Sequence, residues 1–157
     1  MVVLSNISEK INNSEINAFE KQFEIELPKD YKEFLINNNG GYPTELLLTP
    51  EFEEVDPTTL EKRGQAINVE RFFSLNEIAF EYEDILDETY IPAEYIPFAN
   101  TAFGNLILIY VGSKKDYGSI YFSNHDLFDE NNDCFTLSKI SNSFSEFIDS
   151  LYVSDLD

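Results

Sequence analysis

The fold of this chain is indicated early, by Leu27-Pro28-Lys29-Asp30-Tyr31-Lys32-Glu33-Phe34-Leu35-Ile36-Asn37-Asn38-Asn39-Gly40-Gly41. Pro28 suits the first turn of a helix, where its missing N–H has no partner to lose. The run of asparagines and glycines predicts the end of the helix, because both residue types accept the left-handed conformation. The stretch therefore predicts a helix over about residues 28–38. Its apolar side chains share one face by the i, i+3, i+4 rule: Tyr31, Phe34 and Leu35.

Three further helices are expected on either side of this stretch. The first covers about residues 14–23, with an apolar face of Ile16, Phe19 and Phe23 and capping residues just before it. A capping box from Ser74 to Glu77 predicts a helix over about residues 75–87. A second box, formed by Ser143 and Glu146, starts a C-terminal helix.

The strands are expected to be short and to cluster late in the chain. Residues 106–111 are almost continuously apolar, which is typical of a central strand buried on both faces. Residues 51–57 are acidic and predict a solvated excursion, and residues 123–133 predict a polar loop. The other segments with strand character are residues 46–48, 66–73, 95–99, 119–122 and 134–138.

The order of these elements predicts an α+β fold. Short turns between the late strands favour a mostly antiparallel (mixed) sheet, flanked by an N-terminal helical pair, a middle helix and a C-terminal helix. A chain of 157 residues is long enough for one domain with its own core. We therefore expect a single domain over residues 1–157, with a core over about residues 15–152.

The charge of the chain bears on its partners. Thirty acidic residues against ten basic ones give a net charge of −20, and residues 42–97 hold 14 of the acids and 3 of the bases. Direct binding to DNA or RNA is disfavoured, because phosphate contacts need Lys and Arg. A basic protein partner is favoured, since a field of this sign attracts one. The alternative is that the acidity serves only solubility.

The sequence also bears on where the protein works. Cys134 is the only cysteine, so no intrachain disulfide forms, which is compatible with a reducing cytoplasm. The start of the chain resembles neither a signal peptide nor an anchor. The longest apolar run, residues 106–111, is far shorter than a membrane helix needs. We expect a cytoplasmic protein without membrane contact.

Catalytic and metal-binding patterns are weak. His125 and Cys134 are the only histidine and cysteine, and no flanking motif supports a Cys–His pair. The acids of residues 126–133 lack the glycine and the terminal glutamate of a calcium loop. The sequence therefore predicts no catalytic residue, no metal and no cofactor. A hydrolase that uses paired carboxylates stays as an alternative, because carboxylates are abundant.

Several segments, taken in order, resemble the SUKH superfamily, specifically its Smi/Knr-type members. Together they span about residues 15–152. They are the opening stretch up to Asn39-Gly40-Gly41, Arg71-Phe72-Phe73-Ser74-Leu75 with Glu77-Ile78, Ile96-Pro97-Phe98-Ala99-Asn100 with Gly104-Asn105, Gly118-Ser119-Ile120-Tyr121-Phe122 with His125-Asp126, and Ser143-Phe144-Ser145-Glu146-Phe147-Ile148 with Leu151.

This resemblance implies an α+β fold without enzyme activity. Bacterial members are mostly immunity proteins that bind and neutralise a cognate toxin, often a nuclease, whereas fungal members are tied to cell-wall synthesis and signalling. Our first hypothesis is therefore a non-enzymatic immunity protein that binds a basic toxin domain. The second is a regulatory scaffold or adaptor, and the third is the carboxylate-dependent hydrolase.

The placement of charge, rather than the resemblance, predicts which surface binds the partner. The middle third of the chain interleaves acids with aromatic residues (Phe52, Phe80, Tyr82 and Tyr90), and protein interfaces favour aromatic anchors with charges at the rim. The acidic residues that we expect to face the partner are Glu51, Glu53, Glu54, Asp56, Glu81, Glu83, Asp84, Asp87 and Glu88.

Overall fold

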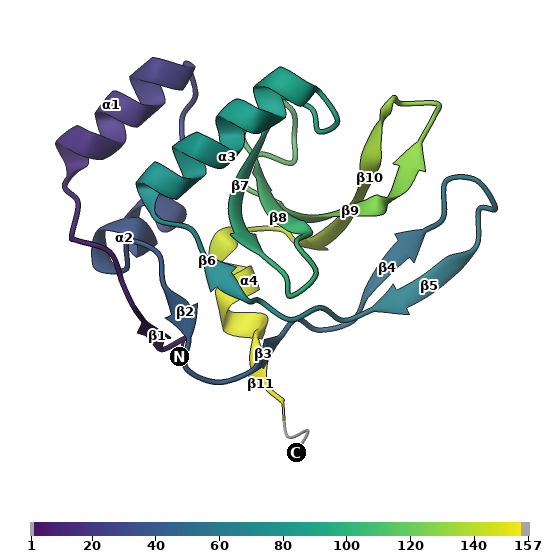
Figure 1. Cartoon of the computed structure of the whole chain (residues 1–157), viewed down its shortest axis with the longest axis horizontal. Coiled ribbons are helices and arrows are strands. Elements are labelled where there is room, and N and C mark those ends of the chain that lie inside the picture. Colours follow the sequence, from purple (N-terminus) through teal and green to yellow (C-terminus); the bar gives the residue numbers. More distant parts are fainter. Residues whose placement is uncertain (1, 155–157) are drawn as a thin grey trace.

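The computed structural model describes residues 2–154, and Figure 1 shows the arrangement of its helices and strands. The elements follow the order β1 (Leu4–Ser5), α1 (Asn13–Phe23), α2 (Lys29–Asn37), β2 (Tyr42–Pro43), β3 (Leu47–Leu48), β4 (Phe52–Val55), β5 (Lys62–Gln65), β6 (Arg71–Phe72), α3 (Leu75–Glu88), β7 (Tyr95–Asn100), β8 (Leu106–Tyr110), β9 (Ile120–Asp129), β10 (Cys134–Ser141), α4 (Phe144–Ser150) and β11 (Tyr152–Val153).

One five-stranded sheet organises the molecule, with the strand order β10-β9-β8-β7-β6. Each neighbouring pair in it is antiparallel. The central strand is β8, whose residues Ile107, Leu108 and Ile109 are fully buried, as the continuous apolar run predicted. The remaining described strands form two-stranded antiparallel pairs. The prediction of an α+β fold is thus confirmed.

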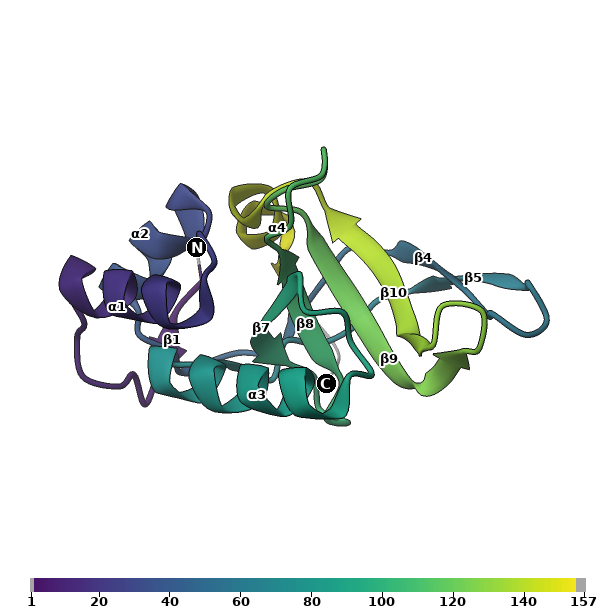
Figure 2. The ribbon, with the colours of Figure 1, turned by 90° about the horizontal axis from the view of Figure 1, so that it is seen from above.

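Helices α1 and α2 and the two long hairpins lie at opposite ends of the molecule, with α3 and α4 between them. In the two views, α1 and α2 lie together at one end, and α3 packs against β7 (Figures 1 and 2). At the other end, β4 runs beside β10, so that the β4–β5 and β9–β10 hairpins project together. None of the helices in residues 2–154 combines the length and the apolarity needed to cross a lipid bilayer.

The start of α3 is fixed by the predicted capping box. The Ser74 hydroxyl accepts a hydrogen bond from the Glu77 N–H at 3.2 Å, and the Glu77 carboxylate accepts one from the Ser74 N–H at 3.0 Å. At the start of α4 the Ser143 hydroxyl accepts from the Glu146 N–H, but the Glu146 carboxylate accepts from the N–H of Asn142 instead. The second box therefore closes one residue earlier than predicted.

The end of α2 differs from the expectation. Asn38 closes the helix in an extended conformation, with φ of −143°, so no left-handed residue ends it. The left-handed residues are Gly40 and Gly41, and Gly41 exchanges two backbone hydrogen bonds with Phe72 of β6. A Cβ on Gly40 would lie 2.5 Å from the Ser74 nitrogen. The glycines therefore allow the chain to pass close to β6 and the start of α3.

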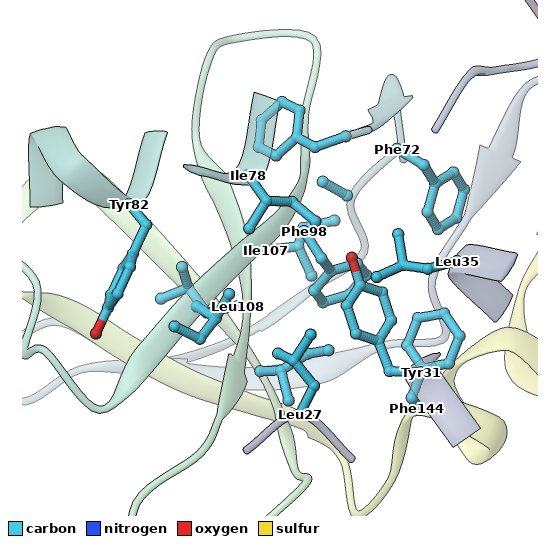
Figure 3. Packing of buried hydrophobic residues seen from close by; sticks show 14 of the residues in the cluster. Leu27, Tyr31, Leu35, Phe72, Ile78, Tyr82, Phe98, Ile107, Leu108 and Phe144 are labelled. Carbon is cyan, nitrogen blue, oxygen red and sulfur yellow. The ribbon is translucent and has the colours of Figure 1, made fainter. Parts of the chain in front are cut away.

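The core lies between the sheet and the helices, as Figure 3 shows. Tyr31 of α2, Phe98 of β7 and Phe144 of α4 form a cluster whose ring centroids are 4.9 to 5.7 Å apart. Ile78 of α3 and Leu35 of α2 are completely buried against it. Each such side chain contributes about 1.5–3 kcal/mol through burial. The helices and the central strands are thus held as one unit.

Two loop predictions were wrong, and one strand prediction was wrong in part. Residues 51–57 are not a solvated excursion, because β4 pairs with β5 and buries Phe52. Of residues 66–73, only Arg71–Phe72 joins the large sheet. Residues 123–133 are mostly strand, since β9 continues to Asp129 and pairs with β10. For residues 51–57 and 123–133, the backbone of a hairpin partner, which no local pattern reveals, decides the structure.

Candidate protein-binding surface

The acidic face of α3, defined as Glu81, Glu83, Asp84, Asp87 and Glu88, is the clearest surface feature of the middle third. The helix buries Ile78, Tyr82 and Ile85 on its inner side, which leaves its acidic residues on the outside. Glu83, Asp84, Asp87 and Glu88 are exposed, and Glu81 is partly buried. The structure therefore brings these five predicted residues together on one helix.

No cation in residues 2–154 pairs with these carboxylates. The nearby Arg71 is engaged elsewhere: it forms an ion pair with Glu77 at 3.1 Å and lies 5.1 Å from the centre of the Phe73 ring. Partial burial raises the pKa of Glu81, and the neighbouring Asp84 carboxylate raises it further. The charge of Arg71 partly offsets these effects at Glu81, whereas the other four carboxylates of the acidic face have no ion-pair partner within residues 2–154.

The position of these acids opposes the dipole of their own helix. The C-terminal end of a helix carries a partial negative charge, which favours cations there. The last turn of α3 contains no basic residue, and Asp87 and Glu88 occupy it. Glu83 and Asp87, like Asp84 and Glu88, are also spaced at i, i+4, where like charges repel. This arrangement destabilises the helix. The presence of acidic residues at these positions is therefore not explained by a contribution to the stability of the fold.

Exposed apolar side chains accompany the acids on and just after α3. Phe80 is 66% exposed, Leu86 43% and Tyr90 48%. The other two aromatic residues predicted to face a partner do not, because Phe52 and Tyr82 are buried. The Tyr82 hydroxyl instead donates to the carbonyl of Ala93. The acidic face therefore combines charge with apolar anchors, the mixture found in protein interfaces.

The β4–β5 arm, defined as residues 52–65, carries the second predicted group of acids. Glu53, on the arm, and Glu51, just before it, are exposed. The Asp56 carboxylate accepts hydrogen bonds from the N–H groups of Thr58 and Thr59, which lower its pKa. Asp56 therefore shapes the turn of the arm in addition to carrying charge.

Glu54 does not belong to the surface, which corrects its assignment as a partner-facing residue. Its side chain is completely buried. One carboxylate oxygen accepts from Arg63 at 2.8 Å and from Gln65 at 3.1 Å, and the other accepts from the amide of Asn124 at 3.1 Å. Glu54 thus connects the β4–β5 arm to β9. Phe52 and Glu54 are buried and Glu53 between them is exposed, which is the alternation of a strand, but the sequence Phe-Glu-Glu-Val does not show it because Glu54 is acidic.

The two predicted acidic groups do not form one surface. In Figure 2 the β9–β10 hairpin lies between α3 and the β4–β5 arm. A partner that covers the acidic face of α3 would therefore have to extend across this hairpin to reach Glu51 and Glu53.

A cleft that sequence reasoning missed lies along the hairpins. Its volume is about 770 Å³, and it extends from the tip of the β4–β5 arm along β10 to the ends of β7 and β8. Three tyrosines line that end: the Tyr95 ring centre is 5.1 Å from that of Tyr110 and 5.2 Å from that of Tyr121. Burial raises the pKa of Tyr95 to about 12. One tyrosine in each of three successive predicted strands was the available signal.

The structure gives little support to catalysis by His125 and Cys134. The register pairs Cys134 with Asp129, four positions from His125 along β9. Cys134 is buried, and burial together with Asp129 and Asp133 raises the pKa of its thiol, which opposes formation of a thiolate. Within residues 2–154 no three His, Cys, Asp or Glu side chains are grouped to hold a metal. The Asp129 carboxylate instead accepts hydrogen bonds from Asn131 and Asn132.

Two comparisons place this chain among known proteins. The sequence profile of the SMI1 / KNR4 family (SUKH-1) matches residues 10–150. The chain is also similar to the SPbeta prophage-derived uncharacterized protein YokK of Bacillus subtilis (strain 168), with 32% identity over 150 residues. That match covers 88% of this chain and 73% of the relative.

Proposed function

The chain belongs to the SMI1 / KNR4 family (SUKH-1), as its ordered motifs predicted, and we propose that it is a non-enzymatic immunity protein that binds and neutralises a cognate toxin. Membership of this family and the similarity to a prophage-derived protein fit an immunity-type protein. We also propose that residues 1–157 act as one domain, and that the protein works in the cytoplasm, where it meets the toxin before the toxin reaches its target.

The acidic face of α3 carries this proposal. Four of its five carboxylates are exposed, none of the five forms an ion pair within the described residues, and Asp87 and Glu88 lie at the helix end where the dipole disfavours them. Local features that oppose stability are expected at functional sites. A bound basic protein would supply the missing cations and reverse the unfavourable balance. The same carboxylates then destabilise the free protein and strengthen its binding to a basic partner.

The chemistry of binding follows from this arrangement. A net charge of −20 attracts a basic toxin and speeds the encounter. Phe80 and Leu86 then supply apolar area that is removed from water on contact. If the toxin is a nuclease, the carboxylates of α3 occupy or cover the groove in which its basic residues bind phosphate. Neutralisation in this form requires no catalytic group and no direct contact with nucleic acid.

Co-expression with the toxin encoded beside this gene tests the proposal. We expect the unaltered protein to rescue growth and the triple variant Glu83→Lys, Asp84→Lys, Asp87→Lys to lose rescue. The matched control is Glu33→Lys, Glu45→Lys, Asp149→Lys, which reverses three exposed acids away from the acidic face of α3 and should keep rescue. Rescue by both variants would contradict the role of this surface, and failure of the unaltered protein would contradict immunity to that toxin.

The same experiment separates the adaptor alternative. A regulatory scaffold would bind a protein of its own host and would give no protection against the neighbouring toxin. Affinity purification with the unaltered protein and with the α3 variant then shows whether the bound protein is a toxin and whether it uses the acidic face of α3.

A further inference from the structure

We propose that the cleft beside β10 binds a single basic side chain, arginine or lysine, presented by the protein partner. This inference rests on the proposed function and deepens it, because it assigns a second contact that recognises one residue of that partner. The cleft has a volume of about 770 Å³, enough to admit a protruding side chain with its neighbouring backbone.

The end of the cleft offers aromatic rings to a cation. Tyr95 of β7 lies directly opposite Tyr110 of β8, and Tyr121 of β9 stands edge-on to Tyr95, with the two ring planes at 90°. Tyr95 and Tyr121 keep part of their surface accessible to the cleft, and Tyr110 forms the buried base. The faces of tyrosine rings attract Arg and Lys side chains through the ring quadrupole. Adjacent rings in different orientations allow a cation to contact more than one of them.

The backbone beside the tyrosines leaves room for this arrangement. Gly112 follows β8, and a Cβ added there would collide with the ring and hydroxyl of Tyr110. Burial raises the pKa of Tyr95 to about 12, and burial also raises the pKa of Tyr121. A tyrosine hydroxyl is protonated at neutral pH in any case, and the raised pKa values keep both rings uncharged into the alkaline range. Uncharged rings present their electron-rich faces without a phenolate that would have to be desolvated.

Carboxylates around the cleft favour a cation over an anion. Glu94, Asp116 and Asp129 line it, against Lys114 among the described lining residues. Asp116 is already paired with Lys139 at 3.5 Å, and Asp129 stays ionised because hydrogen bonds from Asn132 and Asn131 lower its pKa. Glu94 is exposed next to Tyr95 and forms no ion pair within residues 2–154. A basic side chain on Tyr95 would therefore meet a free carboxylate.

The test uses the purified protein and two blocked tripeptides, one with a central arginine and one with citrulline, which has the same shape without the charge. Binding is followed through the NMR signals of the tyrosine rings. We expect the arginine peptide to shift Tyr95, Tyr110 and Tyr121 saturably, with a dissociation constant on the order of millimolar. The citrulline peptide should not do so. Equal binding of both peptides, or no response of these rings, would overturn the proposal.

Matched variants distinguish loss of the Tyr121 ring from a general loss of folding. Tyr121→Leu should weaken binding of the arginine peptide roughly three- to tenfold, because it removes one ring face. Tyr121→Phe keeps the ring and should bind normally, and Tyr152→Leu, an exposed tyrosine of β11, should also bind normally. Circular dichroism confirms that each variant is folded. Unchanged affinity of Tyr121→Leu contradicts the proposal, and so does a loss in Tyr121→Phe as large as that in Tyr121→Leu.

The failure of this inference is distinguishable from failure of the immunity proposal. The peptide experiment needs no toxin, so absence of peptide binding rejects the cleft contact and leaves rescue untouched. Conversely, an unaltered protein that binds the arginine peptide but gives no rescue rejects immunity to that toxin alone. If both hold, Tyr121→Leu should weaken binding to the toxin by a similar factor.

Discussion

Glu54 and Asn124, which are 70 positions apart in the chain, meet in the interior, where the Asn124 amide donates to the Glu54 carboxylate at 3.1 Å. The remaining partners of that carboxylate, Arg63 and Gln65, belong to the opposite strand of the same hairpin. This one side chain therefore holds β4 to β5 and the β4–β5 arm to the large sheet.

Replacing Glu54 should destabilise the protein. Glu54→Ala leaves the buried amide of Asn124 without its acceptor and opens a cavity, which together cost about 2–4 kcal/mol in the free energy of unfolding. Arg63 is largely exposed and can be hydrated again, which limits the loss. Urea denaturation measures the difference. Glu53→Ala, one position away and exposed, should change stability by less than about 0.5 kcal/mol. Equal effects of the two variants would contradict the buried network.

Reversing charge at the end of α3 should stabilise the free protein. Asp87→Lys with Glu88→Lys places cations at the negative end of the helix dipole and removes two i, i+4 repulsions, which together add about 0.5–1.5 kcal/mol. The gain should shrink in high salt. Asn76→Lys, which adds a cation at the opposite end of the same helix, should lower stability slightly. A stabilised variant that also fails to protect against the toxin would link the strained charges directly to binding.

Two glycines of similar φ should respond differently to alanine. Gly40 has φ of 78° and its added Cβ would lie 2.5 Å from the Ser74 nitrogen, whereas Gly104 has φ of 81° and nothing within 4 Å. Gly104→Ala should cost only the backbone strain, about 1 kcal/mol. Gly40→Ala should cost about 2–4 kcal/mol, because the chain must also move away from the start of α3. Thermal or urea denaturation of the two variants tests the difference, and equal losses would show that the contact is not tight.

Stability should fall at alkaline pH through the tyrosines of the cleft. The pKa of Tyr95 is about 12 in the folded state against 10.0 ordinarily, so the folded protein holds the proton more tightly than the unfolded chain. Its contribution is complete below pH 10 and is lost progressively as pH rises toward 12. Urea denaturation from pH 10 upward should show a shallower decline in Tyr95→Phe. The same slope in both proteins would contradict burial of this hydroxyl.

The sequence predicted the parts of the fold that depend on local signals. The capping box at Ser74, the inner face of α3 and the central strand β8 each depend on residues close together in the sequence, and the structure contains all three. The acidic face of α3 could be predicted for the same reason, since the helical period alone places its residues on the outside.

The errors arose where a distant partner decides the structure. An acidic residue such as Glu54 is ordinarily exposed. Its burial becomes favourable only because Asn124, which is distant in the sequence, and Arg63 donate hydrogen bonds to its carboxylate. Residues 123–129 read as loop by composition, but the hairpin with β10 supplies their hydrogen bonds. The tyrosine cleft was missed because its three rings come from separate strands, and the register that aligns them follows from the assembled sheet.

The β4–β5 arm is fastened at its base and free at its tip. Its attachment depends on Glu54 and on Phe52, whose ring centre lies 5.7 Å from that of Phe122 in β9, while Thr58, Thr59 and Leu60 at the turn are exposed. Insertions or exchanges in that turn would leave both fastening points intact and would reshape one wall of the cleft. The sequence of this turn can therefore change without disturbing the core, so that the shape of one wall of the cleft is independent of the stability of the fold.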